Sequence, residues 1–410
     1  MDLWRRAFAV LLGLIVFMLA FTLIFAVMPY SIMFLFAKAR DKTTEVASSL
    51  RHAMIENFLL QMANEKPIRF TPQQLAGFTG DYSSLLGAGG FGTVYKGALP
   101  NGLAVAVKVL QGDLDRRSEE QFMAEVGTIG RTHHVNLVRL LGFCFDPKVR
   151  ALVYEYMENG SLDAYLFNRN KAVDLPTLRD IAVGVARGLR YLHEECQRKI
   201  IHYDIKAGNI LLDGGLTPKV ADFGLAQLVN RADTHVSMSC IRGTPGYTAP
   251  EMWMQLGITE KCDVYSFGML LLELVGRRRN FDEAAASESQ QWLPMVAWTK
   301  YESGTLMDLL VQPALRDDDH DVAAAQLSRE LMERICKVAF WCVQQQPGAR
   351  PPIGAVVKML EGEMAIAPPA NPFQHLMASA SVSNMWMTTA SSVSSKSALA
   401  NGCNEIIVSL

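Results

Sequence analysis

The chain has 410 residues, of which 50% are hydrophobic and 20% charged, and a formal net charge of −2 at pH 7. A chain of this length can form two or three structural units with a large core, and its balanced charge argues against nucleic acid as a partner. Its seven cysteines are scattered without a Cys-x-x-Cys pair, so we expect reduced thiols and neither a disulfide framework nor a zinc site.

The first predicted element is an apolar segment near the N-terminus. No charged residue occurs from position 7 to position 37, and a helix of that length would be about 46 Å long, more than the roughly 30 Å of a bilayer core. Pro29 can end or kink it, which leaves a span of about 33 Å at 7–28. The run is longer than that of a signal peptide and has no polar face. We therefore expect a transmembrane segment at 7–36 after a short flank at 1–6.

Charges beside this segment predict its orientation. Two cations precede it and four follow it: Arg5 and Arg6, then Lys38, Arg40, Lys42 and Arg51. The positive-inside bias places the downstream chain in the cytoplasm. Residues 37–79, with a helical pattern at 46–60, are expected to be a juxtamembrane connector, the alternative being an extra helix packed on the following domain. A cleaved signal followed by a luminal chain is a weaker interpretation, because the cysteines show no disulfide pattern.

The rest of the chain divides into a β-rich part and a helical part. Short β-rich runs occur at 103–110 and 151–156, with one helical stretch at 119–129. After Gly160 the pattern is helical, at 175–196, 263–275 and 331–343. From Ala365 onward Pro, Ala, Met and Ser dominate. We expect an α+β chain with a small β-rich lobe at 80–158, a larger helical lobe at 159–362 and a disordered tail at 363–410.

A glycine-rich run between two β-patterned segments is expected to form the tip of a hairpin. Glycines let backbone N–H groups approach phosphate oxygens closely. The run lacks the strand-to-helix context of a dinucleotide site and the Gly-Lys-Ser/Thr of a P-loop. Lys108, sixteen residues after Gly92, lies in an apolar strand where an unpaired ammonium is costly to bury, so it needs anions. The phosphate-binding run comprises Gly87, Ala88, Gly89, Gly90, Phe91 and Gly92.

One of those anions is expected to be Glu125. In the helical stretch at 119–129, Phe122 and Val126 mark the inward face by their i, i+4 spacing, and Glu125 lies on the same face. Glu119 and Glu120 are expected to project elsewhere. Glu125 is therefore the predicted partner of Lys108, which would also hold the α- and β-phosphates of a nucleotide.

A second set of polar residues follows the strand-like run at 199–201. Asp204 can accept or orient a proton of an incoming hydroxyl, Lys206 can meet a transferring phosphate, and Asn209 can bind a metal. Asp222, eighteen residues after Asp204, offers a hard oxygen ligand for Mg²⁺. Each motif is weak alone, but their order and spacing together predict a site for a nucleoside triphosphate and its metal.

These motifs carry a resemblance to a known family. Residues 80–362 resemble the eukaryotic protein-kinase domain and, more narrowly, plant receptor-like serine/threonine kinases. The narrower resemblance rests on further motifs at 143–144, 152–156, 159–162, 243–247 and 263–268. It implies a bilobal protein-kinase fold, here preceded by one transmembrane helix. It also implies that the chain binds ATP with Mg²⁺ or Mn²⁺ and transfers the γ-phosphoryl group to serine or threonine.

The resemblance also implies roles for single residues. Tyr154 would be the gatekeeper behind the adenine pocket, Thr244 would pack near Asp204, and Glu251 would pair with Arg350 as a structural contact. Further residues would bind the nucleotide, through backbone groups, through the ribose or by lining the pocket: Glu155, Met157, Asp163, Val94, Ala106 and Leu211.

Two features depart from the family pattern. Tyr203 stands where the family usually has an arginine that binds a phosphorylated activation segment, so we hypothesise regulation through dimerisation, partner binding or helix position. Lys219 is a candidate substitute cation near the activation segment. Only about six residues precede the apolar segment, whereas receptor-like kinases usually carry an ectodomain there. The chain is then expected to be a partner subunit of a co-receptor or receptor, the alternatives being a truncated isoform or an incomplete gene model.

The predicted protein is thus a single-pass membrane protein, at the plasma membrane, whose cytoplasmic domain phosphorylates serine or threonine of cytosolic proteins. The alternative is a pseudokinase scaffold that signals by docking alone. Against that alternative, every chemical group of the site is present in the sequence: Lys108, Glu125, Asp204, Asn209 and Asp222.

Overall fold

The computed structural model describes residues 13–14, 17–18, 38, 49, 53–57, 59, 67–89, 92–110, 116–168, 173–231, 243–254, 257–281, 292–309 and 322–374. The chain separates into two compact units, Met1–Asn64 and Glu65–Leu410. The described residues of the first unit are helical. Within the described residues no helix has the length and apolar character needed to cross a bilayer. The predicted flank at 1–6 and most of the predicted transmembrane segment at 7–36 lie outside those residues.

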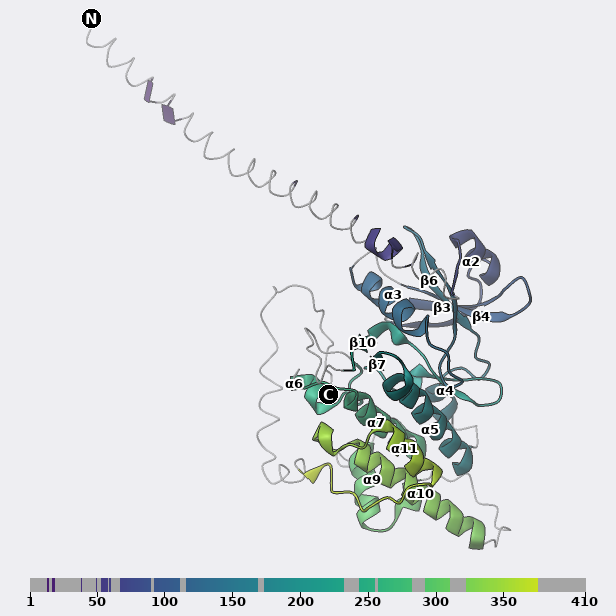
Figure 1. Cartoon of the computed structure of the whole chain (residues 1–410), viewed down its shortest axis with the longest axis vertical. Coiled ribbons are helices and arrows are strands. Elements are labelled where there is room, and N and C mark those ends of the chain that lie inside the picture. Colours follow the sequence, from purple (N-terminus) through teal and green to yellow (C-terminus); the bar gives the residue numbers. More distant parts are fainter. Residues whose placement is uncertain are drawn as a thin grey trace, which may run out of the picture. The chain divides into compact units, whose positions relative to one another are not determined.

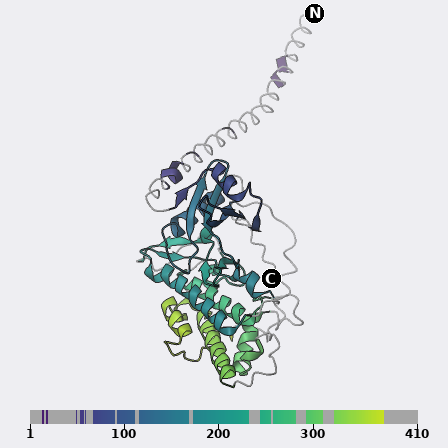
Figure 2. The ribbon, with the colours of Figure 1, turned by 90° about the vertical axis from the view of Figure 1, so that its right-hand side faces the viewer.

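The second unit opens with a six-stranded sheet in the order β1-β5-β6-β4-β3-β2 (Figures 1 and 2). Its neighbouring strands are antiparallel except β1 and β5, which run parallel. The β-rich runs predicted at 103–110 and 151–156 are confirmed as β4 and β6. The strands are β1 (Ile68–Arg69), β2 (Leu85–Gly89), β3 (Gly92–Ala98), β4 (Ala104–Val109), β5 (Leu140–Phe145) and β6 (Arg150–Glu155).

Helix α3 (Arg116–Ile129) packs on this sheet. Phe122 and Val126 are fully buried, and the Phe122 ring lies 5.2 Å from the ring of Phe145 in β5. The helix predicted at 119–129 is therefore confirmed, and it buries the face that the apolar spacing indicated.

A shorter helix, α2 (Pro72–Thr79), corrects the predicted start of the β-rich lobe. It begins with a capping box, in which the Thr71 hydroxyl accepts from the Gln74 amide and the Gln74 side chain accepts from the Thr71 amide. Leu75 of this helix is fully buried in a core cluster with Phe70 and residues of β4. The lobe therefore begins near residue 67, and the prediction of a connector over 37–79 is wrong for residues 67–79. Those residues match the alternative of a helix packed on the domain.

The larger lobe is mostly helical and is built around α7 (Lys261–Gly276). Every residue of α7 after Lys261 is buried, including the polar residues Asp263, Ser266 and Glu273. It packs against α5, α9 and α10. The helices predicted at 175–196, 263–275 and 331–343 are confirmed, although the first ends in a π-turn and the last begins earlier. The helices are α4 (Leu162–Leu166), α5 (Leu175–Arg190), η1 (Tyr191–Glu195), α6 (Pro250–Met254), α9 (Leu293–Glu302), η4 (Leu306–Leu309), α10 (Val322–Cys342), η5 (Pro347–Ala349) and α11 (Ile353–Glu361).

Short strands and turns of the larger lobe lie below the sheet and carry the polar motifs. One strand pair joins β7 to β10 and another joins β8 to β9, both antiparallel. These elements are β7 (Lys199–Ile201), η2 (Ala207–Asn209), β8 (Ile210–Leu212), β9 (Pro218–Val220), η3 (Phe223–Leu225) and β10 (Gln227–Val229). A β-sheet lobe and a helical lobe thus form the bilobal arrangement that the sequence predicted.

The segment after α11 corrects the predicted tail. Phe373 is fully buried, and its ring lies 4.8 Å from that of Trp292. Side chains of α10 and the turn after it donate to backbone carbonyls of this segment: Trp341 to Ala367, Gln344 to Ala370 and Gln345 to Pro372. The prediction of a disordered tail from residue 363 is therefore wrong over 363–374, and residues 375–410 lie outside the described part of the chain.

A buried ion pair joins two distant parts of the larger lobe. Arg350 is 1% exposed and donates from Nη1 and Nη2 to the two carboxylate oxygens of Glu251, at 2.6 and 2.8 Å. This bidentate contact is the structural pair that the family resemblance implied, and it ties α6 to the turn before α11.

Candidate active site

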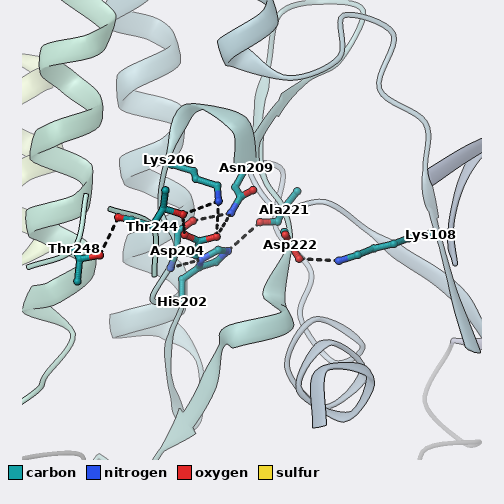
Figure 3. A network of polar contacts seen from close by, with 9 residues as sticks. All are labelled: Lys108, His202, Asp204, Lys206, Asn209, Ala221, Asp222, Thr244 and Thr248. Atoms are coloured by element: carbon teal, nitrogen blue, oxygen red, sulfur yellow. Dashed lines mark hydrogen bonds and ion pairs between the residues drawn. The ribbon is translucent and has the colours of Figure 1, made fainter. Parts of the chain in front are cut away.

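Lys108 joins the two lobes of the second unit. It lies on β4 opposite Leu152 of β6, and its Nζ donates to Glu125 Oε1 at 2.6 Å. The same Nζ donates to Asp222 Oδ1 at 2.7 Å (Figure 3). Burial alone lowers the pKa of Lys108, but the two carboxylates outweigh it and hold the pKa above its ordinary value. The anionic partners that the sequence demanded for this ammonium are therefore present, and Glu125 is one of them.

Asp222 begins the turn η3 in a left-handed conformation, with φ of 63°. Burial tends to raise the pKa of its carboxyl, but the Lys108 ammonium outweighs burial and keeps the pKa below its ordinary value. Asp222 is thus ionised at neutral pH. The residue before it, Ala221, donates its amide to the Asn209 carbonyl at 2.8 Å, so the two residues predicted to bind a metal come from adjacent segments.

Three polar side chains gather around the Asp204 carboxylate (Figure 3). The Thr244 hydroxyl donates to Asp204 Oδ1 at 2.6 Å, and Lys206 Nζ donates to Asp204 Oδ2 at 2.9 Å. Lys206 also donates to the Thr244 hydroxyl at 2.7 Å, and Asn209 Nδ2 donates to Asp204 Oδ2 at 2.9 Å. One carboxylate thus faces a hydroxyl, an ammonium and an amide, with its side chain only 3% exposed.

Helix α7 holds the loop that carries Asp204 through hydrogen bonds to its backbone. Asp263 of α7 is fully buried and accepts the backbone amides of His202 and Tyr203, both at 2.8 Å. The His202 ring links this loop to the strand before Asp222, because its Nε2 contacts the Ala221 carbonyl at 3.0 Å. A carbonyl can only accept, so Nε2 carries the proton and Nδ1 accepts the Asp204 amide at 3.2 Å. Sequence reasoning assigned no role to His202 or Asp263, although Asp263 opens the motif at 263–268 and His202 lies two residues before Asp204.

The glycine-rich hairpin lies above this cluster. β2 and β3 pair from Leu85–Tyr95 to Gly89–Gly92, which confirms the predicted hairpin, while Gly90 and Phe91 at its tip lie outside the described residues. Gly92 has φ of +134°, and a Cβ there would collide with the Val109 carbonyl. Glycine is therefore required at this position by the backbone itself.

The remaining residues predicted to bind the nucleotide lie around the junction of the lobes. Val94 pairs with Lys108, and Ala106 pairs with Tyr154. Met157 accepts the Gly160 amide through its carbonyl, and Leu211 bridges to Ser161. The Asp163 carboxylate accepts from the Ser161 hydroxyl at 2.5 Å. Glu155 ends β6, where its side chain accepts the Arg139 amide at 2.8 Å.

Three contacts near this cluster were not foreseen. The buried Tyr154 hydroxyl donates to Glu125 Oε2, so the residue expected behind the adenine pocket also contacts the partner of Lys108. Glu119 projects to a different side of α3 from Glu125, as expected, and there it is buried against Arg150. Lys219 contacts Glu155 at 3.3 Å and the Val135 carbonyl at 3.2 Å. Its described partners therefore lie near the lobe junction, and the suggestion that it serves the activation segment is not supported.

Tyr203 occupies the position of the missing arginine. It is 2% exposed and has a left-handed backbone with φ of 67°. Gly243, with φ of +104°, packs so closely on the Tyr203 carbonyl that a Cβ would lie only 2.8 Å from that oxygen. A buried aromatic ring thus stands where the family usually places a cation.

Comparison with known proteins agrees with this geometry. Residues 81–360 match the family model described as protein tyrosine and serine/threonine kinase. A G-type lectin S-receptor-like serine/threonine-protein kinase of Arabidopsis thaliana is 46% identical over 316 residues, 77% of this chain and 37% of that protein. A rice kinase of the same description, LECRK1, is 45% identical over 78% of this chain and 39% of its own length. The rust resistance kinase Lr10 of Triticum aestivum is 41% identical over 78% of this chain and 50% of its own length.

The chain spans about half or less of the length of these relatives. The matched region contains the Lys108–Glu125 pair, the Asp204 cluster and Asp222, each in the geometry described above. This chain therefore belongs to the protein tyrosine and serine/threonine kinase family and, within it, is similar to plant receptor-like serine/threonine kinases.

Proposed function

We propose that this chain transfers the γ-phosphoryl group of ATP to serine or threonine hydroxyls of cytosolic proteins. The observation that carries the proposal is the Asp204 cluster, where a hydroxyl donates to the carboxylate while Lys206 contacts both. A substrate hydroxyl would donate to Asp204 in the same way. Asp204 would orient it or take its proton, and Lys206 would neutralise charge on the transferring group.

The donor set fits a magnesium nucleotide. Asn209 directs Nδ2 to Asp204, which leaves its Oδ1 as a ligand, and Asp222 is an ionised carboxylate. One carboxylate and one amide oxygen suit Mg²⁺, which takes its other ligands from phosphates and water. When bound, the ion would neutralise charge on the β- and γ-phosphates. Lys108, held by Glu125, would orient the α- and β-phosphates, and the glycine-rich hairpin would cover them.

Phosphate transfer by the full chain tests this proposal. With radiolabelled ATP and a mixed protein substrate, we expect phosphoserine and phosphothreonine. Asp204→Asn should lower kcat about 10²–10⁴-fold while leaving ATP binding intact, and Lys108→Met serves as the inactive control. A wild-type chain that transfers no phosphate would favour the pseudokinase scaffold, and full turnover by Asp204→Asn would remove Asp204 from the mechanism.

We further propose that the chain is anchored in the membrane by residues 7–36, with the kinase domain in the cytoplasm and a receptor partner in the same membrane. The uncharged run at 7–37 and the receptor-like names of the relatives support this proposal. The full chain should sediment with membranes and be released by detergent but not by high salt. Release by salt alone would contradict an integral anchor.

A further inference from the structure

Helix α3 carries a second buried ion pair besides that of Lys108. Arg150 Nη2, at the start of β6, donates to Glu119 Oε1 at 2.8 Å, and the two side chains are only 5% and 9% exposed. The Arg150 guanidinium also lies over the Phe145 ring, 5.0 Å from its centroid. Phe145 in turn packs on Phe122 of α3, so the start of the helix is joined to the sheet by an ion pair and by an aromatic contact.

The two ion pairs hold the helix on different sides. Glu119 and Glu125 are six residues apart, about 9 Å along the helix axis and roughly 120° around it. The Lys108–Glu125 pair constrains α3 at one height along its axis. The Glu119–Arg150 pair adds a second directional constraint at another height and angle, beside the apolar packing of Phe122 on Phe145. Together they keep the carboxylate of Glu125 directed at Lys108.

Stability alone does not explain a charged pair at this place. Burying two charges costs desolvation that their attraction only partly offsets, and an apolar pair of similar size often holds a fold as well. What an Arg–carboxylate contact adds is a defined geometry. A defined orientation of α3 matters on the side of the helix opposite Glu119. There Gln121 packs against Gly224 so closely that a Cβ on that glycine would lie 2.7 Å from Gln121 Cγ.

We propose that the Glu119–Arg150 pair is a positioning device, which fixes the rotation of α3 so that Glu125 meets Lys108 without help from a phosphorylated activation segment. This inference rests on the proposed kinase activity. It assigns this task to the sheet of the small lobe, because the catalytic loop has the buried Tyr203 and no cation at the usual arginine position.

A double-mutant cycle on the full chain tests the proposal. The neutral pair Glu119→Gln with Arg150→Met keeps the volume and removes the ion pair. We expect kcat/KM for ATP to fall about tenfold or more, with thermal stability close to that of wild type. Glu125→Gln should be costly in wild type but add at most about twofold in the neutral-pair background, because both act through one contact. The matched control is Arg187→Met with Glu361→Gln, an ion pair remote from α3, which should leave kcat/KM unchanged.

The outcomes separate the two proposals. If the two losses multiply in the combined variant, or if the neutral pair keeps full kcat/KM, the positioning role is overturned while the kinase activity stands. If the wild-type chain transfers no phosphate, the proposed function fails, and the same cycle read in the Kd for Mg·ATP still decides the positioning role. Non-additive losses in that Kd would support it and multiplicative losses would overturn it.

Discussion

Glu273, near the end of α7, links the loop at 243–247 to the core of the larger lobe. Its carboxyl group accepts from the Tyr247 hydroxyl and from the Asn280 amide. Burial raises the pKa of Glu273 to about 7, whereas an unfolded glutamate titrates near about 4.3. The folded chain therefore binds a proton at Glu273 at a pH where the unfolded chain releases it.

This shift predicts a pH-dependent contribution to stability. Because the folded pKa is raised, Glu273 stabilises the fold fully below about pH 4.3, and that contribution is lost as the pH rises to about 7. Relative to Glu273→Gln, the free energy of unfolding of wild type should fall by about 3 kcal/mol between pH 4.3 and pH 7.5. Urea denaturation of both proteins at both pH values measures the difference, and a difference independent of pH would contradict the assigned protonation.

At the scale of residues, the sequence predicts the side chains that gather in the candidate active site better than the side chains that support them. Lys108, Asp204 and Asp222 could be placed in one site because few residue types serve phosphate and metal at such spacing. The contacts of Asp263 with the loop at 202–203 span about sixty residues. They follow from the packing of α7 in the core, which no local pattern encodes.

At the scale of elements, the start of the activation segment, which the family resemblance places at 222–251, is held by strand pairing and by an arginine. β10 pairs with β7, with Leu228 opposite Ile200. Just after β10, Arg231 Nη2 donates to the carbonyls of Glu194, at 2.7 Å, and Cys196. These carbonyls end the helical run of α5 and η1, where a cation is favourable. The segment thus brings its own positive charge to the C-terminal end of η1.

Loss of this anchor should impair substrate phosphorylation. Arg231→Ala should lower kcat/KM for a protein substrate by about fivefold to tenfold, the equivalent of one to two hydrogen bonds, without changing the Kd for ATP. Arg231→Lys keeps the charge and should retain part of the activity. Phosphatase-treated wild type should remain active. Loss of activity after phosphatase treatment would show that phosphorylation of the activation segment is required.

Element boundaries were least predictable where composition resembles a linker. Residues 67–79 contain two prolines and no long apolar run, yet the capping box at Thr71 and the burial of Leu75 make α2 part of the lobe. Helices with a long apolar stripe, such as α3 and α7, were predictable from spacing alone.

At the scale of the whole molecule, the segment at 363–374 closes the larger lobe. Phe373 is fully buried beside Trp292, and α10 and the turn after it bind the backbone of the segment through three side-chain hydrogen bonds. The sequence could not reveal this, because a single anchoring aromatic in a proline- and alanine-rich stretch has no period.

Removal of this anchor should destabilise the larger lobe. Phe373→Ala should lower the free energy of unfolding by about 3–5 kcal/mol, the usual cost of a fully buried phenylalanine. Phe281→Ala is the matched control, because Phe281 is 44% exposed and should cost below about 1 kcal/mol. Chemical denaturation of both variants measures the costs, and equal costs would contradict the role of the segment.

The Tyr154 side chain has a consequence for inhibitor design. Its side chain is buried and its hydroxyl donates to Glu125, and the family resemblance implies that its ring lies behind the proposed adenine site. Drug-like compounds with a bulky group aimed past adenine would therefore meet a closed wall, and smaller, flat compounds should be favoured. The substitution Tyr154→Gly would enlarge this site for a bulkier chemical probe, but it would also remove a hydrogen-bond donor to Glu125. Sensitisation of this enzyme to such probes would then come with a weakened enzyme.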